Sequence, residues 1–230
     1  MIAPSPPAAL LAALLCSTAA NAGTAGQVLD PGYGSPQYQP PAPGSYQLPP
    51  LGSAADGKVL NTLGEPLALR DLIGDKLVLM GFIYTHCSDI NGCPLATFVM
   101  KKVQDRLAED ADLAQQVRLI SLSFDPVQDT PAALLDYAGN FRRKGFDWEF
   151  LTTASEAELL PILEGYGQWR QREYDKDGNY TGNISHILRV FLIDRQGRIR
   201  NIYSSGFLDA ATVVNDLHTL AMEPRATAGS

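Results

Sequence analysis

The sequence predicts an α/β domain with a central mixed β-sheet flanked by helices. Two nearly continuous apolar runs, residues 76–84 and 117–124, have the composition of strands that are buried on both faces. Each run is followed by a segment that carries helix-start signals or apolar residues at helical spacing. Because parallel strands need a crossover connection, this alternation predicts a parallel unit at the centre of the sheet.

The first half of the domain is predicted to contain a hairpin, a buried strand and an amphipathic helix. Residues 58–69 predict two short strands around a Gly-Glu-Pro turn, and residues 76–84 form the first buried strand. A helix follows, with Pro94 at its first position, so Cys93 is the predicted N-cap. The apolar face of this helix is predicted to consist of Leu95, Phe98, Val99, Val103 and Leu107.

The second half predicts further strands and helices in alternation. In order, these are a strand at 117–124, a helix from Pro131 to about Arg143 with Thr130 as N-cap, a strand at 148–152, a helix at 155–166, a hairpin at 169–184, strands at 187–194 and 198–204, and a helix from Asp209. A parallel crossover followed by an antiparallel pair and a last helix is the order of a thioredoxin-like fold. This chain adds an N-terminal hairpin and an inserted hairpin to that order.

Composition excludes several classes of protein. The 230 residues carry 18 Lys and Arg against 25 Asp and Glu, a net charge of −7 that argues against a nucleic-acid partner. Hydrophobic residues make up 45% of the chain and charged residues 19%, as in globular domains. No apolar run approaches the roughly 20 residues of a transmembrane helix, and three cysteines are too few for a disulfide-dense scaffold.

The amino-terminal segment, residues 1–22, predicts a secretory signal peptide. A stretch of Ala and Leu precedes an A-x-A cleavage signature that ends at Ala22, although no Lys or Arg comes before the stretch. Cleavage there would remove Cys16 and leave Cys87 and Cys93, an even pair suited to an oxidising compartment. The sequence therefore predicts a periplasmic or otherwise exported protein, and leaves open whether the mature form is soluble or anchored to the membrane.

The remaining domain boundaries follow from composition. Residues 23–44 are rich in Pro and Gly with a single charge, so they predict a flexible, partly extended linker. Residues 45–222 are predicted to form the folded domain, a usual size for one unit. Residues 223–230 are predicted to be a disordered tail.

The two cysteines of the domain lie at its predicted reactive centre. Cys87 and Cys93 follow the carboxyl end of a central strand and precede a helix, whose unpaired N–H groups favour an anion such as a thiolate. As the predicted N-cap, Cys93 should have a lowered pKa and be the more reactive thiol. The alternative is a plain stabilising disulfide between the two residues.

Three motifs around these residues resemble the Sco/SenC family: GFIYTHCSDINGCP, SFDPVQDTP and SHILRVFLIDRQGRI. The resemblance spans roughly residues 45–220. It implies a thioredoxin-like domain that binds copper and serves assembly of the dinuclear copper A centre of cytochrome c oxidase. By this resemblance Cys87 and Cys93 are the sulfur ligands and His186 is the nitrogen ligand. Thiolates suit Cu(I) and an imidazole with two thiolates also accepts Cu(II), so either state can be the cargo.

The chain departs from the family pattern at two places. Five residues separate Cys87 from Cys93 where the family has three, and the Asn91-Gly92 pair predicts an enlarged turn that tolerates a positive φ. Ser185 stands before the ligand histidine where the family often has Asp, so charge compensation is lost there.

Other polar residues near the motifs receive structural assignments. His86 is predicted to be a supporting or solvent-exposed residue, because side chains alternate in direction along an extended chain. Asp125 is assigned to an Asp-Pro turn and Asp129 to the helix cap that follows. Met100 is assigned to the core or a helix flank, and His218 to solvent.

Two functions remain in competition from the sequence. The resemblance predicts a metallochaperone, which is not an enzyme and hands copper to an oxidase subunit or another acceptor. The alternative is a thiol-disulfide oxidoreductase that uses the Cys87 and Cys93 pair with a thioredoxin-like reductant, although two intervening residues are usual there. A peroxiredoxin-type enzyme would need a T-x-x-C motif, which is missing around Cys87. The copper donor, the acceptor, the copper redox state and the oligomeric state stay open.

Overall fold

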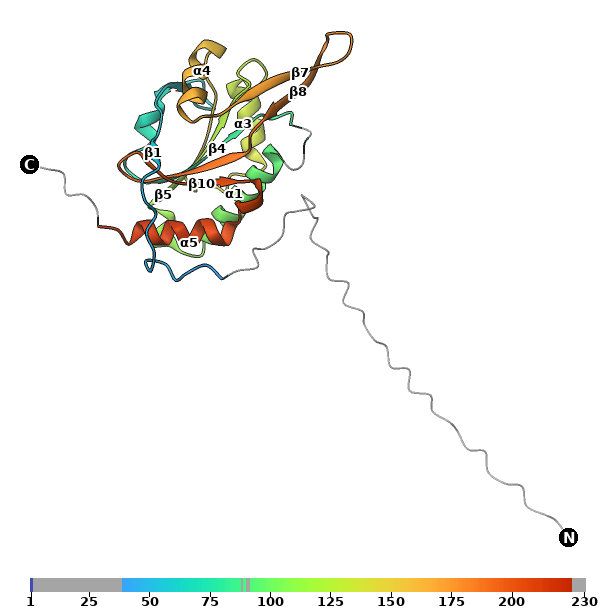
Figure 1. Ribbon diagram of the computed structural model, residues 1–230. Coiled ribbons are helices and arrows are strands. Elements are labelled where there is room, and N and C mark those ends of the chain that lie inside the picture. The colour runs from blue at the N-terminus through green and yellow to red at the C-terminus, as the bar shows by residue number, and fades with distance from the viewer. Residues whose placement is uncertain (2–38, 88, 90–91, 225–230) are drawn as a thin grey trace, which may run out of the picture.

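The computed structural model describes residues 1, 39–87, 89 and 92–224 (Figure 1). The predicted signal peptide, most of the predicted linker and residues 225–230 lie outside the described residues. Among the residues that are described, no helix combines the length and the apolar character needed to cross a membrane.

A six-stranded mixed sheet forms the centre of the domain. Its order is β1 (Gly52–Ser53), β10 (Arg198–Ser204), β9 (Arg189–Ile193), β4 (Leu77–Ile83), β5 (Val117–Ser123) and β6 (Trp148–Leu151). The strands β4, β5 and β6 are parallel, whereas β9 runs antiparallel to both β4 and β10. All seven residues of β4 are buried, as its unbroken apolar run predicts for a strand covered on both faces.

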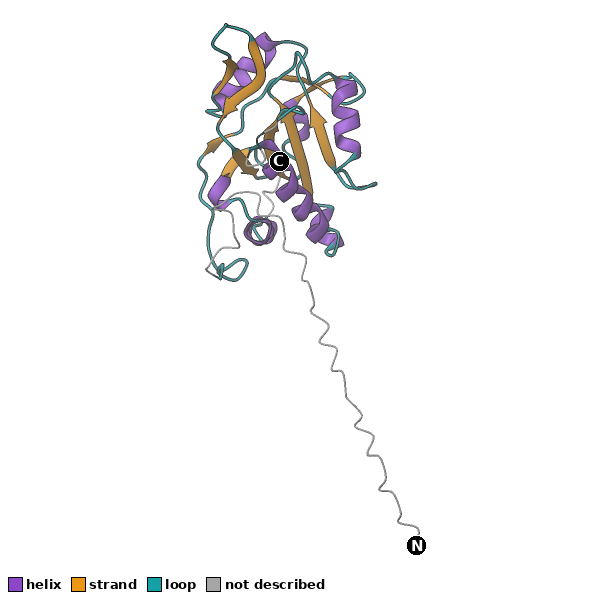
Figure 2. Ribbon diagram, turned by 90° about the vertical axis from the view of Figure 1, so that its right-hand side faces the viewer, coloured by secondary structure: helices purple, strands orange, loops and turns teal. Residues whose placement is uncertain are grey.

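Helices cover both sides of this sheet (Figure 2). They are α1 (Cys93–Leu107), α2 (Ala111–Ala114), α3 (Pro131–Gly139), α4 (Glu156–Gly165) and α5 (Ala210–Ala221), with short 3₁₀ helices η1 (Leu69–Leu72) and η2 (Ser205–Phe207). In Figure 1, α5 lies below the sheet beside α1 and α4 lies above it. The predicted order of strands and helices is therefore observed, and both crossover helices return the chain to a parallel strand.

Two hairpins lie outside the central sheet, as predicted. The first pairs β2 (Lys58–Leu60) with β3 (Pro66–Ala68), and the second pairs β7 (Arg170–Tyr174) with β8 (Tyr180–His186). The second hairpin projects from the body of the domain in Figure 1. Strand β8 is longer than expected, so His186 is the last residue of this hairpin and not a loop residue before β9.

The structure of helices α1 and α3 corrects three expectations: the N-cap of α1, the buried face of α1 and the end of α3. The N-cap of α1 is Gly92, because its carbonyl already accepts the first helical hydrogen bond, from Ala96 N–H at 3.2 Å. Cys93 is therefore the first residue of the helix and Pro94 the second. Phe98 is 39% exposed and does not belong to the buried face of α1. Helix α3 ends at Gly139, four residues before the predicted end.

Candidate metal centre

The two cysteines lie on the loop that joins β4 to α1. After β4 ends, the chain turns at once, since Cys87 N–H donates to the carbonyl of Tyr84 at 3.3 Å. The chain turns again where Gly92 N–H donates to the carbonyl of Asp89 at 3.0 Å, and Cys93 then begins α1. Both thiols are free, with Cys93 buried and Cys87 partly buried. The site therefore sits at the carboxyl edge of the parallel strands, where the topology of an open α/β sheet leaves a crevice.

His186, the last residue of β8, lies next to this loop. Its Nε2 atom lies 3.5 Å from Cys93 Sγ, while its Nδ1 atom lies 3.0 Å from the carbonyl oxygen of Ile184. A carbonyl can only accept, so Nδ1 carries the proton and donates it. In the neutral ring, Nε2 then keeps its lone pair and directs it toward the sulfur. The ring is fixed between Tyr84 and Phe124, with centroids 5.9 Å and 4.7 Å away.

The two thiols differ in acidity, in the opposite sense to the sequence prediction. A hydrogen bond from Cys93 lowers the pKa of Cys87 to about 6, and a second hydrogen bond from Tyr84 adds to this effect. Burial raises the pKa of Cys93 well above its usual value, and the hydrogen bond to Cys87 raises it further. Desolvation disfavours the charged thiolate, and at Cys93 it outweighs the position at the helix start. Cys87 is therefore the more reactive thiol, and the prediction for Cys93 was wrong.

Tyr84 joins the cysteine loop to the hairpin, a role that the sequence analysis missed. Its hydroxyl is hydrogen-bonded to Cys87 and also accepts a hydrogen bond from Ile184 N–H at 3.4 Å. Burial, followed by the bond to Cys87, raises the pKa of Tyr84, so the phenol stays protonated. Its sequence signals were its place at the end of a buried strand and within the motif GFIYTHCSDINGCP.

Two neighbouring residues at the end of the hairpin, Ser185 and His186, make different contacts. Ser185 Oγ donates to the carboxylate of Glu173 on the paired strand β7, whereas His186 faces the cysteines. Neighbouring residues of a strand point to opposite faces. Ser185 therefore supports the hairpin and does not hydrogen-bond to His186.

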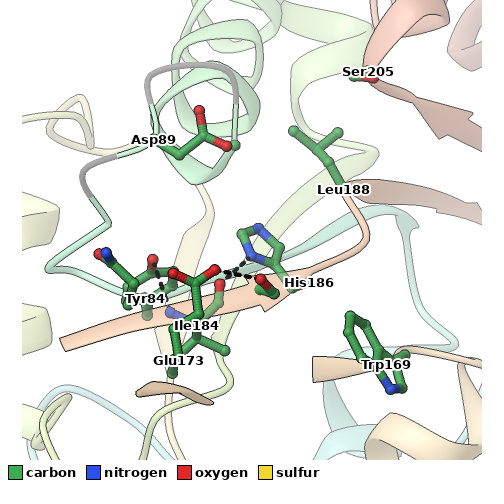
Figure 3. Close-up of a pocket in the computed structure, with 11 residues that line it drawn as sticks. Tyr84, Asp89, Trp169, Glu173, Ile184, His186, Leu188 and Ser205 are labelled. Atoms are coloured by element: carbon green, nitrogen blue, oxygen red, sulfur yellow. Dashed lines mark hydrogen bonds between the residues drawn. The ribbon is translucent and has the colours of Figure 1, made fainter. Parts of the chain in front are cut away.

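A pocket of about 440 Å³ lies over His186 (Figure 3). It is lined by Tyr84, Asp89, Gly92, Trp169, Glu173, Asn183, Ile184, Ser185, His186, Leu188 and Ser205. Gly92 has a φ of −96°, so the turn does not use the positive φ that an Asn-Gly pair tolerates at this glycine. A Cβ at Gly92 would lie 3.4 Å from His186 Cε1 and 3.3 Å from the carbonyl oxygen of Asp89. A side chain at this position would therefore be tightly packed against the loop backbone and the histidine ring, and glycine leaves this space open.

The structure connects the three predicted ligands in pairs. Cys93 contacts His186, and Cys87 is hydrogen-bonded to Cys93. In the described part of the chain, no three His, Cys, Asp or Glu side chains are gathered closely enough to hold a metal ion. A three-ligand site would therefore need Cys87 to turn toward His186. The loop between the cysteines contains residues 88, 90 and 91, which lie outside the described residues.

The structure also places four other polar or sulfur-containing residues that the sequence analysis assigned to structural roles. Met100 is fully buried in the core, as assigned, and His218 is partly exposed, 3.6 Å from Asp110. Asp125 is buried in the turn after β5, where one carboxylate oxygen has no hydrogen-bond partner among the described residues. Asp129 is not part of the helix cap, because Thr130 Oγ1 alone accepts from Ala133 N–H. Asp129 is instead fully buried against Thr85, on the cysteine loop.

Comparison with known proteins agrees with this architecture. The family model SCO1/SenC matches residues 55–222. The chain is 38% identical over 145 residues to the SCO1 protein homolog of Bacillus subtilis (strain 168), covering 63% of this chain and 69% of that protein. The chain therefore belongs to the SCO1/SenC family.

Solved structures agree with the fold. The structure of Bradyrhizobium japonicum ScoI with copper bound matches with a TM-score of 0.60 and 27% identity, covering 73% of this chain and 99% of that one. A SCO1/SenC family lipoprotein from Bacillus anthracis str. Ames matches with a TM-score of 0.64 and 23% identity, covering 76% and 99% of the two chains. The predicted thioredoxin-like fold and the predicted family resemblance are confirmed.

Proposed function

We propose that this chain is a copper-binding protein that holds the metal through Cys87, Cys93 and His186. The observation that carries the proposal is the orientation of His186, whose Nδ1 is satisfied by Ile184 and whose Nε2 faces Cys93 Sγ at 3.5 Å. Two sulfurs and one imidazole form a soft donor set that suits Cu(I) and also accepts Cu(II). The lowered pKa of Cys87 supports the same function, because the thiolate is the form that binds a metal.

The protein's own residues determine how copper would be held. Tyr84 keeps Cys87 near the hairpin through its two hydrogen bonds, and the Ile184 carbonyl fixes the ring orientation of His186. Copper is the cargo of this protein, and a cysteine that is still protonated when it binds copper releases its proton to solvent. Because Cys87 is partly exposed and Cys93 is buried, a partner protein can exchange ligands with the metal at Cys87.

The test is an anaerobic titration of the reduced protein with Cu(I) against a competing chelator. We expect one tightly held copper per chain, with affinity lowered roughly tenfold or more, at least about 1.4 kcal/mol, by Cys87→Ser, Cys93→Ser and His186→Ala. His218→Ala is the matched control, since His218 lies on α5 and contacts Asp110. Equal affinity of His186→Ala and the unaltered protein would overturn the three-ligand site.

A second function is favoured by the unequal acidity of the cysteines. Cys87 has a lowered pKa and is partly exposed, so it is suited to attack a partner's disulfide and form a mixed disulfide. The buried Cys93 beside it would then attack the mixed disulfide and release the partner. His186→Ala separates the two functions. It should leave the reduction potential of the cysteine pair largely unchanged if the protein is a thiol-disulfide oxidoreductase, while copper binding requires the histidine.

The cellular setting is also part of the proposal. We propose that residues 1–22 direct export, that residues 23–44 act as a tether, and that the folded domain works in the periplasm or an equivalent compartment. The B. anthracis relative is a lipoprotein, which supports an exported family member. The proposed acceptor is the copper-bearing subunit of cytochrome c oxidase, as family membership implies, with a thioredoxin-like protein as reductant.

A further inference from the structure

His86 occupies the exposed face of the cysteine loop. Residues 84–87 form a turn, so the extended backbone on which the sequence assignment of His86 relied is not observed. The side chain of His86 is 65% exposed, Cys87 is partly buried, and Cys93 is only 1% exposed. The exposure of these potential copper ligands thus falls from His86 through Cys87 to Cys93.

The ring of His86 is tied to a buried carboxylate through a hydroxyl. Thr85 Oγ1 lies 2.5 Å from Asp129 Oδ1 and 3.0 Å from His86 Nδ1. A threonine hydroxyl has one hydrogen, and the short contact with the carboxylate uses it. His86 Nδ1 must therefore be the donor to Thr85 Oγ1. In the neutral ring, Nε2 then carries a lone pair, and it has no hydrogen-bond partner among the described residues.

Asp129 holds this arrangement in place. The carboxylate is fully buried and also accepts from Thr85 N–H at 3.1 Å and from Ser123 Oγ at 2.5 Å. Buried charges are retained when such hydrogen bonds satisfy them. A carboxylate that orients a histidine through its second nitrogen is the usual support of a metal-binding imidazole. Here Asp129 supports the ring through Thr85 at His86 Nδ1. The other ring nitrogen, Nε2, lies on the far side of an exposed ring.

We propose that His86 Nε2 is a capture ligand that takes Cu(I) from a donor and passes it to Cys87. This inference rests on the proposed function. One bond between copper and the donor breaks as the Nε2–copper bond forms, the donor's remaining bonds break as the sulfur ligands bind, and copper stays in the Cu(I) state throughout. The copper then bonds to Cys87 Sγ, any remaining thiol proton goes to solvent, and Nε2 is released. His86 is absent from the final site, so it changes the rate of loading and not the equilibrium affinity.

The test is a stopped-flow measurement of copper transfer from the Cu(I)–bicinchoninate complex to the reduced full chain. We expect His86→Ala to load about tenfold more slowly than the unaltered protein and to reach the same final occupancy. His218→Ala is the matched control for removal of a histidine remote from the loop, and it should load at the original rate.

Three results would overturn the inference. The first is an unchanged loading rate in His86→Ala. The second is a loss of equilibrium affinity in His86→Ala as large as in His186→Ala, which would make His86 a resident ligand. The third is an unaltered protein that takes up no copper, which would overturn the proposed function as well. The first two results leave the proposed function standing, so the two failures are distinguishable.

Discussion

At the scale of single residues, burial separates two cysteines that share one loop. Cys87 and Cys93 both lie near the amino end of α1, where helix N–H groups favour a thiolate. Cys93 is almost fully enclosed, so desolvation raises its pKa, and its S–H then serves as a donor to Cys87. The acidic thiol is the one that keeps partial access to solvent.

This difference predicts the pH dependence of alkylation in the reduced, metal-free protein. Because the pKa of Cys87 is lowered to about 6, its thiolate is present above that pH and is lost as the pH falls through it. Iodoacetamide should label Cys87 first, with a rate that rises through a midpoint near pH 6. Peptide mass spectrometry measures which cysteine is labelled at each pH.

The cause of the shift can be tested with a matched pair of variants. Cys93→Ala removes the hydrogen-bond donor and should move the labelling midpoint of Cys87 upward, toward the usual thiol range. Cys93→Ser retains a donor and should hold the midpoint closer to 6. An unchanged midpoint in Cys93→Ala would show that the hydrogen bond from Cys93 does not cause the shift. In the unaltered protein, faster labelling of Cys93 than of Cys87 would contradict the assignment of Cys87 as the acidic thiol.

At the scale of elements, the hairpin β7–β8 is held to the body of the domain by charge. A two-stranded ribbon is marginally stable by itself. Glu156, at the start of α4, forms ion pairs with Arg170 and with Arg172, the latter at 2.7 Å. Arg172 also lies 3.6 Å from Asp125. Since His186 is the last residue of this hairpin, the same ion pairs help to position the histidine.

We therefore expect Glu156→Gln to loosen the hairpin without unfolding the domain. The side chains of Glu156 and Arg172 are 35% exposed and that of Arg170 is 12% exposed, so solvent weakens the pairs. The loss should be about 1 kcal/mol, or roughly fivefold faster amide exchange in β7 and β8. Amides of β4 should exchange at their original rate. Hydrogen exchange followed by mass spectrometry measures both.

Glu164→Gln is the control for the hairpin experiment, because Glu164 is exposed on the same helix. It should leave hairpin exchange unchanged. Equal exchange rates in Glu156→Gln and the unaltered protein would show that the strand pairing, and not the ion pairs, holds the hairpin.

At the scale of the whole molecule, residues 41–50 form an N-terminal strap across α5 and β10. The strap is held by Asp216, whose carboxylate accepts from Tyr46 OH at 2.5 Å, Asn201 Nδ2 at 2.8 Å and Tyr203 OH at 2.6 Å. Gly44 N–H adds a hydrogen bond to Thr219 Oγ1 at 3.2 Å. The chain thus enters the domain along α5 (Figure 1), and the last residues of the predicted linker contact this helix.

Removal of this carboxylate should destabilise the whole domain. In Asp216→Ala the buried Tyr203 hydroxyl loses its acceptor, and three hydrogen bonds to a charged group are lost together. We expect the free energy of unfolding to fall by about 3 kcal/mol, measured by urea denaturation. Asp136→Ala, at an exposed position on α3, should change it by no more than about 0.5 kcal/mol. A similar small change in Asp216→Ala would show that the strap adds nothing to stability.

Much of the fold and the identity of the candidate ligands could be predicted from the sequence. Buried strands such as 76–84 are visible because apolar composition follows from burial on both faces, and helix starts such as Thr130-Pro131 follow from local hydrogen bonding. Both signals depend on residues close together in the chain. The family motifs around Cys87, Cys93 and His186 added the ligand types, and family membership is now established.

The sequence by itself determined the order of strands and helices, the class of protein and the residue types at the candidate site. Only the tertiary structure decided that Cys87 and not Cys93 is the acidic thiol, that Tyr84 joins the loop to the hairpin, and that Asp129 supports Thr85 and His86. The physical reason is that desolvation and hydrogen bonding depend on which distant segments enclose a group. Periodicity and local signals describe a residue's neighbours along the chain, whereas these properties are set by its neighbours in space.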